Sequence, residues 1–500
     1  MAAAAAAVTA GLLLGTGCSL DSQEPATVTL PENGIAPSTV PPTLGPGGPP
    51  DAGGSGPDDS TPPTLAWAVQ VGGSGDDTLR AVTGSQSSVI AVGSTAAGVA
   101  QPTSGGRDVL SATVSTGGEV ESVEQFGGAG DDDGTGVASS QDAVLACGSA
   151  TGALGQDAGG SSDGWCSPLP ADPGQQLARF GGLDNELITG LALPPDAVTP
   201  SSATGAGYAS GVTDGFLPGA EDPVGRGLGQ GDALVFRLAA DGTAIWGRQF
   251  GTPAEDSATA VCAVDTDGIF VGHTDGDLEG MSNGVRDGWI SRIDDTGVPR
   301  WVTQFGSSGN DLFAAVATSG EARRGTEAFI AVGSTDGDID AEGPLANSGE
   351  QDAIVTAFGS DGSALWVTQL GGELADTATA VVSDGSTVYV AGNTRTAPIA
   401  DPAAPQVGLG ELDPSVGPGG LGDGFLASLD AATGEVRWII RLGTDQEDTV
   451  TTITTTEDGL LVIAGTTGGQ IADTAPAGGL DGFLLAFPLP SSGGAAASSV

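Results

Sequence analysis

Short apolar segments recur along the chain from residue 65 onward, and one in each repeat unit is closed by a glycine. The unit around residue 250 contains four of them, at 245–250, 258–264, 269–272 and 289–293. They are rich in Val, Ile, Thr and Ala, and Asp- and Gly-containing turns separate them. Segments of this length between turn residues predict β-strands, and none is long enough to predict a helix.

The glycine that ends the first segment of each unit is the anchor of the repeat. The seven anchors are Gly72, Gly127, Gly181, Gly251, Gly306, Gly371 and Gly443. Their spacing is shortest from Gly127 to Gly181 and longest from Gly371 to Gly443. Five of the seven tryptophans lie at one repeat position: Trp67, Trp246, Trp301, Trp366 and Trp438. A period of this size predicts a propeller, and we expect these rings to pack between its blades.

Seven units of four strands predict an all-β fold, a seven-bladed β-propeller spanning residues 64–490. The first strand, at 65–71, precedes the first complete unit, and the last unit lacks one strand. We therefore expect the N-terminal strand to complete the last blade as its outermost strand. This pairing would close the ring and leave only short, protected sheet edges.

Two sets of acidic residues recur in register with the anchors. The first set lies five residues after each anchor: Asp77, Asp132, Glu186, Asp256, Asp311, Asp376 and Asp448. The second set begins the third strand of each unit: Asp108, Asp163, Asp232, Asp287, Asp352, Asp423 and Asp481. In a propeller both sets lie on one face. We expect them to accept hydrogen bonds from turn N–H groups; the alternative is a ring that binds cations.

Two loops strengthen the cation alternative locally, because acidic residues alternate in them near a glycine. They contain Asp275, Asp277, Glu279 and Asp336, Asp338, Asp340. Carboxylate oxygens suit Ca²⁺, which extracellular modules bind at roughly 10⁻⁴–10⁻³ M. Neither loop has the full twelve-residue calcium pattern. We assign no metal ligand from the sequence and keep these six residues as weak candidates.

The chain before residue 64 predicts an export signal and a tether. Residues 1–18 are apolar and Ala-rich and end in Leu14-Gly-Thr-Gly-Cys18, which is typical of a signal peptide and too short to span a bilayer. This ending resembles a bacterial lipoprotein signal, which implies that Cys18 is lipidated; secretion without a lipid is the alternative. Residues 19–63 hold 11 of the 31 prolines and predict a disordered linker. We expect a flexible tail at 491–500.

The repeat pattern resembles the SBBP-type bacterial β-propeller repeat. The unit Trp301-Val-Thr-Gln-Phe-Gly306, Asp311, Gly333-Ser-Thr335 and Asp352-Ala-Ile-Val355 carries the resemblance, which extends over residues 65–490. It implies the propeller fold and a secreted or surface protein. A second resemblance, to quinoprotein-type repeats, rests on Leu429-Asp-Ala-Ala-Thr-Gly-Glu-Val-Arg-Trp438. It implies a scaffold lipoprotein of the outer-membrane assembly type.

Charge and rare residues exclude several functions. The net charge is −49, and all 14 basic residues are Arg, which excludes a nucleic-acid binder, because phosphate contacts need a basic surface. The one histidine, His273, leaves almost no room for a histidine-based metal site or triad. We interpret it as structural, since sister units place Ser, Asn or Thr there.

The cysteines are consistent with export. Cys147 and Cys166 fall on strands two and three of one unit, where a disulfide and two buried thiols are both open. Cys262 has no evident partner and is predicted to be a small core residue.

These observations predict an exported, lipid-anchored or secreted propeller that serves as a non-catalytic binding or scaffold module at the cell surface. The connections between strands two and three, the longest at 395–422, would form the recognition surface. The expected partner is a surface protein or a glycan, the expected state is a monomer, and no cofactor is expected unless Ca²⁺ binds. The competing hypothesis is a glycan hydrolase that uses paired carboxylates.

Overall fold

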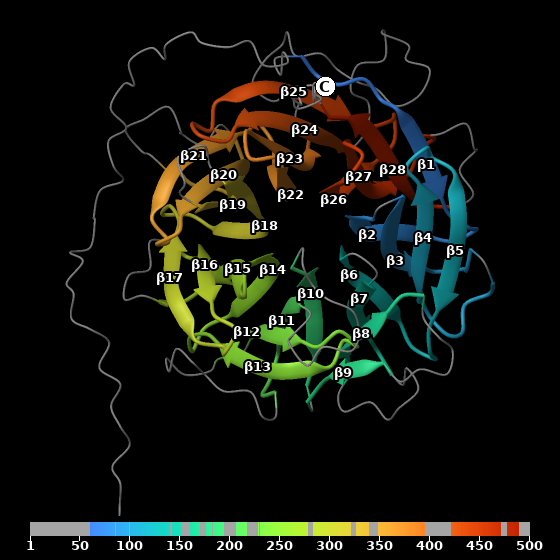
Figure 1. Cartoon of the computed structure of the whole chain (residues 1–500), viewed down its shortest axis with the longest axis horizontal. Helices are drawn as coiled ribbons and strands as arrows, with labels where there is room; N and C mark the ends of the chain where they lie inside the picture. The colour runs from blue at the N-terminus through green and yellow to red at the C-terminus, as the bar shows by residue number, and fades with distance from the viewer. Residues whose placement is uncertain are drawn as a thin grey trace, which may run out of the picture. The chain divides into compact units, whose positions relative to one another are not determined.

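The 28 strands of the computed structural model form seven four-stranded antiparallel sheets, which we number as blades 1–7 (Figure 1). The structure describes residues 61–489 except 86, 100, 141–142, 153–160, 171–176, 183, 195–206, 218–228, 230, 279–283, 322–326, 340–348, 396–421 and 472–477. The predicted signal peptide, the tail and linker residues 19–60 lie outside these ranges. No helix in the described part is long and apolar enough to cross a membrane.

In each blade the strands run in chain order from the innermost to the outermost, except that β1 is the outermost strand of blade 7. Blades 1 and 2 are β2 (Asp77–Gly84), β3 (Ser88–Thr95), β4 (Asp108–Ser115), β5 (Val120–Phe126), and β6 (Asp132–Ser140), β7 (Ala143–Ala150), β8 (Asp163–Pro168), β9 (Ala178–Phe180). Blades 3 and 4 are β10 (Glu186–Ala192), β11 (Gly207–Thr213), β12 (Asp232–Leu238), β13 (Ala244–Phe250), and β14 (Asp256–Val264), β15 (Asp267–Thr274), β16 (Asp287–Ile293), β17 (Pro299–Phe305). Blades 5 and 6 are β18 (Asp311–Glu321), β19 (Glu327–Thr335), β20 (Asp352–Gly359), β21 (Ala364–Leu370), and β22 (Asp376–Ser383), β23 (Thr387–Thr394), β24 (Asp423–Asp430), β25 (Val436–Leu442). Blade 7 is β26 (Asp448–Thr455), β27 (Leu460–Thr467), β28 (Asp481–Pro488) and β1 (Trp67–Val71).

The N-terminal strand closes the ring, as the strand count predicts. β1 pairs with β28 in antiparallel register, from Trp67 opposite Ala486 to Val71 opposite Gly482. The innermost strands contact one another in sequence, and β2 also contacts β26, so blades 1 and 7 are neighbours. The predicted seven-bladed propeller is therefore confirmed, including the two units that lack the repeat tryptophan.

Every innermost strand contains a β-bulge at its fourth residue, which the sequence analysis did not predict. In five blades this residue is a threonine whose hydroxyl donates to a backbone carbonyl of the next innermost strand. The bonds run from Thr135 to Ile188 (2.5 Å), Thr189 to Ala258 (2.7 Å), Thr259 to Phe313 (2.6 Å), Thr379 to Val450 (3.1 Å) and Thr451 to Leu79 (2.7 Å). Because the bulge leaves this residue outside the ladder, its side chain can join one blade to the next.

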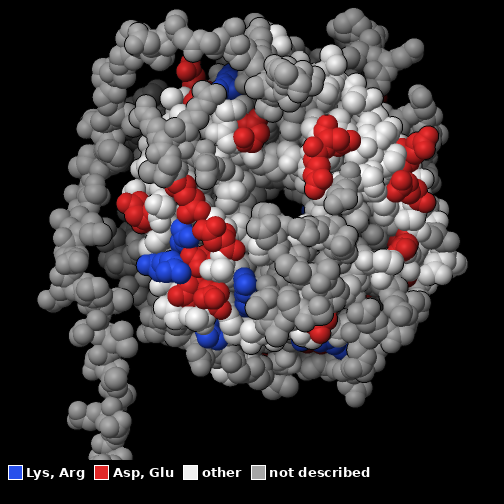
Figure 2. All heavy atoms as spheres, in the orientation of Figure 1, with Lys and Arg blue, Asp and Glu red and all other residues white. Residues whose placement is uncertain are grey.

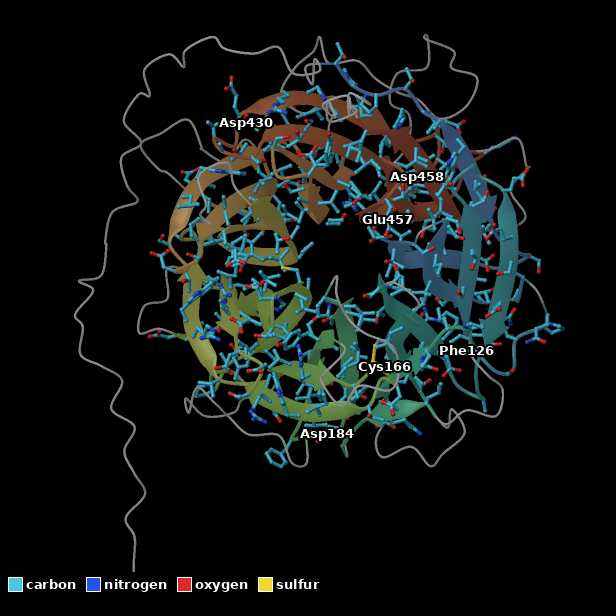
Figure 3. The ribbon with its side chains drawn as sticks, viewed as in Figure 1. Phe126, Cys166, Asp184, Asp430, Glu457 and Asp458 are labelled. Atoms are coloured by element: carbon cyan, nitrogen blue, oxygen red, sulfur yellow. A yellow bond between two sulfur atoms is a disulfide. The ribbon has the colours of Figure 1, made fainter. Side chains whose placement is uncertain are left out.

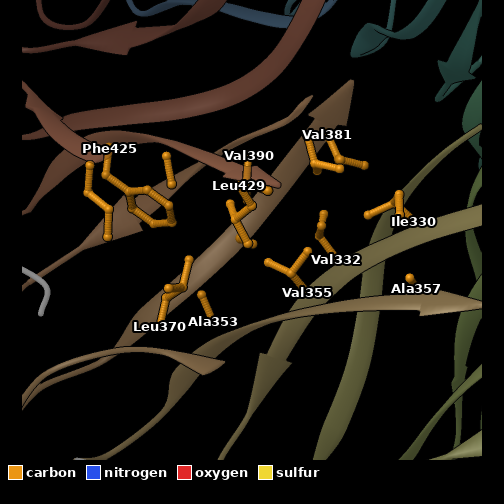
Figure 4. Packing of buried hydrophobic residues seen from close by; sticks show 14 of the residues in the cluster. Ile330, Val332, Ala353, Val355, Ala357, Leu370, Val381, Val390, Phe425 and Leu429 are labelled. Carbon is orange, nitrogen blue, oxygen red and sulfur yellow. The ribbon is translucent and has the colours of Figure 1, made fainter. Parts of the chain in front are cut away.

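Neighbouring blades also share their hydrophobic cores. Figure 4 shows one such cluster, in which Val332 and Val355 of blade 5 meet Val390 and Leu429 of blade 6. The repeat tryptophans continue this packing at the rim, where four of them donate through Nε1 to a turn of the following blade. The acceptors are the carbonyls of Thr116 for Trp67, Asp295 for Trp246, Ser360 for Trp301 and Ala431 for Trp366. The predicted packing between blades is thus confirmed at these four rings.

Blade 2 lacks the repeat tryptophan and contains a disulfide instead. Cys147 on β7 and Cys166 on β8 are directly opposite each other and bonded (Figure 3). Cys166 packs on Gly242, in the corresponding turn of blade 3: a Cβ on this glycine would lie 3.1 Å from the Cys166 Cβ. The disulfide therefore occupies a contact that Trp67, Trp301 and Trp366 make in other blades. Cys262 is partly buried on β14 and packs against the core between blades 4 and 5.

Candidate recognition face

The two acidic sets define one face of the propeller, because each acid is the first residue of its strand. We call this the recognition face: it contains the turns between blades and the connections from second to third strands. The seven turns between blades are equal in length, as 72–76 and 127–131 illustrate. The second-to-third-strand connections differ in length: 96–107 is among the shortest and 395–422 is the longest. The turns between blades are therefore constant in length, whereas the second-to-third-strand connections vary in length.

The acids of the first set hold the turns between blades. Each accepts a hydrogen bond from the backbone N–H four residues earlier. The donors are Gly73 for Asp77 (2.6 Å), Gly128 for Asp132 (2.6 Å), Gly182 for Glu186 (2.7 Å), Thr252 for Asp256 (2.6 Å), Ser307 for Asp311 (2.6 Å), Gly372 for Asp376 (2.7 Å) and Thr444 for Asp448 (2.5 Å). The predicted turn-capping role is confirmed for all seven.

The acids of the second set bind a side chain that sequence reasoning missed. The donor is the residue two positions before the anchor glycine, a glutamine in five blades and an arginine in two. The pairs are Gln70–Asp481 (2.8 Å), Gln125–Asp108 (2.9 Å), Gln249–Asp232 (3.0 Å), Gln304–Asp287 (2.7 Å), Gln369–Asp352 (2.9 Å), Arg179–Asp163 and Arg441–Asp423. The signal was present as Gln or Arg before an apolar residue and glycine in every unit.

The same glutamine ties the base of a variable connection to the sheet. In blade 4, Gln304 donates to Asp287 and to the carbonyl of Gly276 (3.0 Å), and its Oε1 accepts from the Leu278 N–H (2.9 Å). Gln249 makes the equivalent bonds in blade 3. The connections therefore start from a rigid base, which is how binding loops are usually held.

Each anchor glycine separates two buried carboxyl groups, one from each set. A Cβ on Gly306 would lie 2.3 Å from Asp287 Oδ1 and 2.7 Å from Asp311 Oδ2, so only glycine fits. Both acids are buried, as are the other members of the two sets. Burial raises the pKa of Asp311, and the facing hydroxyl of Thr335 offsets part of the rise. These recurring acids are structural, since a substrate could not reach them without displacing the turn.

The calcium candidates already have partners inside the protein. Asp275 binds Arg286, with 2.6 Å between Oδ1 and Nε, and Asp336 accepts from the backbone N–H (2.5 Å) and side-chain amide (2.6 Å) of Asn310. Asp277 and Asp338 are exposed, whereas Glu279 and Asp340 lie outside the described residues. Within the described ranges no group of three acidic, histidine or cysteine side chains is arranged to hold a metal ion. Calcium binding stays a prediction.

His273 and Cys262 have the electrostatics of core residues. His273 lies near the end of β15, and burial together with the Arg286 charge lowers its pKa to about 4. Burial raises the pKa of Cys262 to about 12. At neutral pH the imidazole is therefore uncharged and cannot serve as a general acid, and the thiol is protonated and does not supply a thiolate nucleophile.

Acidic side chains are spread widely over the surface. Figure 2 shows one face of the ring, on which carboxylates lie at intervals around a central opening and arginines gather over the region of β13 to β17. In that region Arg292 and Arg300 both bind the buried Asp267 (Nε–Oδ2 2.7 Å each), and Arg292 also reaches Glu327 of blade 5 (2.8 Å). Arg292 and Arg300 are therefore committed to ion pairs within the protein.

No family model and no curated protein matches the chain. Among solved structures it is similar to a phage phi92 endosialidase (TM-score 0.42, 10% identity, 87% of this chain and 71% of that one). It is also similar to a europium-containing methanol dehydrogenase (0.36, 12%, 85% and 93%) and to Drosophila Semaphorin 1b extracellular domains 1–2 (0.40, 10%, 85% and 87%). At these scores the likenesses carry no argument about function. The SBBP-type resemblance stays a prediction, and the fold rests on the sheet topology.

Proposed function

We propose that this protein is an exported, non-catalytic binding or scaffold module whose recognition face binds a surface protein or a glycan. One observation carries the proposal: the long connections are concentrated on one face. Each second-to-third-strand connection is longer than every connection of the opposite face except 193–206. Variable loops on a constant, hydrogen-bonded base are the usual arrangement of a binding surface.

The burial and bonding of the recurring acids favour a binding function over a catalytic one. The recurring carboxyl groups of both sets are buried and bonded to turns, glutamines or arginines, which leaves them no role toward a substrate. A hydrolase would need a different pair of acids. The chain also lacks the P-loop and HExxH patterns. Its two G-x-S-x-G matches, at 160–164 and 280–284, lead into strands β8 and β16 and not into a helix, so they lack the strand-to-helix turn of a nucleophile elbow.

Export and anchoring complete the proposal. The apolar segment at 1–18 would direct secretion, Cys18 would carry the lipid, and the Pro-rich linker at 19–63 would hold the propeller away from the membrane. The Cys147–Cys166 disulfide suits an oxidising compartment. Metabolic labelling with a fatty-acid analogue tests the anchor: label is expected on the wild-type chain and absent from Cys18→Ala, and equal labelling would contradict it.

Affinity capture from cell-envelope extracts tests the binding function. The wild-type protein is compared with two variants in which segments of equal length are replaced by Gly and Ser, at 402–413 between β23 and β24 and at 195–206 between β10 and β11. We expect the first replacement to abolish capture and the second to preserve it. Retention by both variants, or chemical conversion of the captured molecule, would argue against the proposal and, in the second case, for a hydrolase.

A further inference from the structure

The register of the two innermost strands places a hydroxyl opposite the first-set acid in six blades. The partners are Thr95, Thr213, Thr274, Thr335, Thr394 and Thr467. In blade 3 the bond is direct, since Thr213 Oγ1 donates to Glu186 at 2.8 Å. In blades 4 and 7 burial raises the pKa of Asp256 and Asp448, and the facing threonine is the largest opposing influence. Threonine at this position therefore stabilises the ionised acid.

Blade 2 breaks this rule, because Ala150 lies opposite Asp132. An alanine cannot donate, so Asp132 relies on the Gly128 N–H (2.6 Å). Asp132 is 1% exposed and its neighbour Asp108 is 0% exposed. A Cβ on Gly127, between them, would lie 2.3 Å from Asp108 Oδ1 and 2.9 Å from Asp132 Oδ2. Two buried carboxyl groups thus meet across one glycine.

The charges around this pair do not neutralise it. Asp131 and Asp133 flank Asp132 and add negative charge. The nearby cation is Arg107, which is bonded to Asp133 (3.0 Å) and close to Asp131 (3.8 Å). The neighbouring strands β5 and β7 contribute the neutral Gln125, bonded to Asp108, and Ala150. The second-set acids of blades 2 and 6, Asp163 and Asp423, are in a different situation, because each is bound by an arginine.

We propose that Asp108 and Asp132 form a proton-binding site that regulates how the connection at 96–107 is held on the recognition face. Burial, with the Asp108 charge adding to it, raises the pKa of Asp132 to about 6. The proton comes from water and binds the Asp132 carboxylate, which lies beside Asp108 across Gly127. Asp108 accepts the Ser104 N–H (3.0 Å), and Gln125 accepts the Val99 N–H (3.2 Å), so the pair is linked to the connection at 96–107. The regulatory consequence rests on the proposed binding function, whereas proton binding does not.

The titration is tested without any partner. Full-length protein labelled with ¹³C at the aspartate carboxyl carbons is titrated by NMR, with Asp132→Asn to assign the signal. We expect a midpoint near pH 6, shifted down by about one unit in Ala150→Thr, because a hydrogen bond to a charged group is worth about that much. The reciprocal variant Thr335→Ala should raise the Asp311 midpoint. An equal midpoint in wild type and Ala150→Thr would overturn the proposal.

Hydrogen exchange tests the link to the connection. After correction for intrinsic rates, the Ser104 amide should exchange several-fold faster at pH 5 than at pH 7.5, because the protonated Asp132 would compete with the Ser104 N–H for the Asp108 oxygens. In Ala150→Thr the change should move to lower pH. A Ser104 exchange rate that does not change across the titration of Asp132 would overturn the proposed regulation of the connection. Both outcomes are independent of ligand capture, so failure of the binding function would be seen separately.

Discussion

The contact between Trp301 and the next blade can be tested by substituting one glycine, Gly362. Gly362 lies in the turn between β20 and β21 with a φ of +81°, and Trp301 of blade 4 packs on it. A Cβ at this position would lie 2.8 Å from Trp301 Cε3 and 2.8 Å from Thr303 Oγ1. The substitution Gly362→Ala therefore strains the backbone and also pushes the two blades apart.

Gly459 provides a matched control for the backbone strain alone. Its φ is +86°, and nothing lies within 4 Å of a Cβ built on it. An alanine in this left-handed region costs about 1–2 kcal/mol, which is the full expected effect of Gly459→Ala. Overpacking costs about 1–3 kcal/mol more, so Gly362→Ala should lower the free energy of unfolding by about 2–5 kcal/mol.

Equilibrium urea unfolding measures both variants. We expect the free energy of unfolding to fall further for Gly362→Ala than for Gly459→Ala, by about 1 kcal/mol or more. Gly434→Ala should resemble Gly362→Ala, because its Cβ would lie 2.4 Å from Trp366 Cε3. Equal losses for Gly362→Ala and Gly459→Ala would refute the conclusion that these tryptophans join the blades.

Three further predictions concern charge, covalent linkage and closure. The raised pKa values of Asp132, Asp256 and Asp311 mean that the folded protein binds protons more tightly than the unfolded chain. Urea midpoints should therefore fall as the pH rises from 5 to 7.5; for Asp132 the loss over this range is at most about 1.4 kcal/mol, and less where solvent screens the charge. Midpoints that rise over this range would contradict the burial argument. Replacing Cys147 and Cys166 by serine opens a link of sequence separation 19 and should cost about 3 kcal/mol; no loss under oxidising conditions would show that the link does not stabilise blade 2. Deleting residues 65–71 removes β1 from the β28 edge and should lower the melting temperature by about 10 °C or more, whereas unchanged melting would contradict the closure by β1.

The architecture could be predicted because the sequence repeats its structural residues in every unit. The anchor glycine, the two acids and the short apolar segments recur at corresponding positions, and each has a local physical role. The role of the first-set acids needed no knowledge of the fold, since the donor is always the N–H four residues earlier, as Ser307 is for Asp311.

The partners of the second set could not be predicted in the same way. Gln304 and Asp287 lie on different strands and meet only because β16 and β17 pair in a particular register. The bulge threonines pose the same problem, since Thr259 binds a carbonyl in the next blade. The calcium interpretation of Asp275 and Asp336 was weakened for a related reason, because Arg286 and Asn310 occupy their oxygens only in the folded chain.

The central claim is that the recognition face binds a partner and leaves it chemically unchanged. Isothermal titration of a captured partner against the wild-type protein, the 402–413 replacement and the 195–206 replacement tests this claim most directly. We expect an affinity at least about tenfold weaker for the 402–413 replacement, wild-type affinity for the 195–206 replacement, and an intact partner after the titration. Equal affinity for all three proteins, or a cleaved partner, would contradict it.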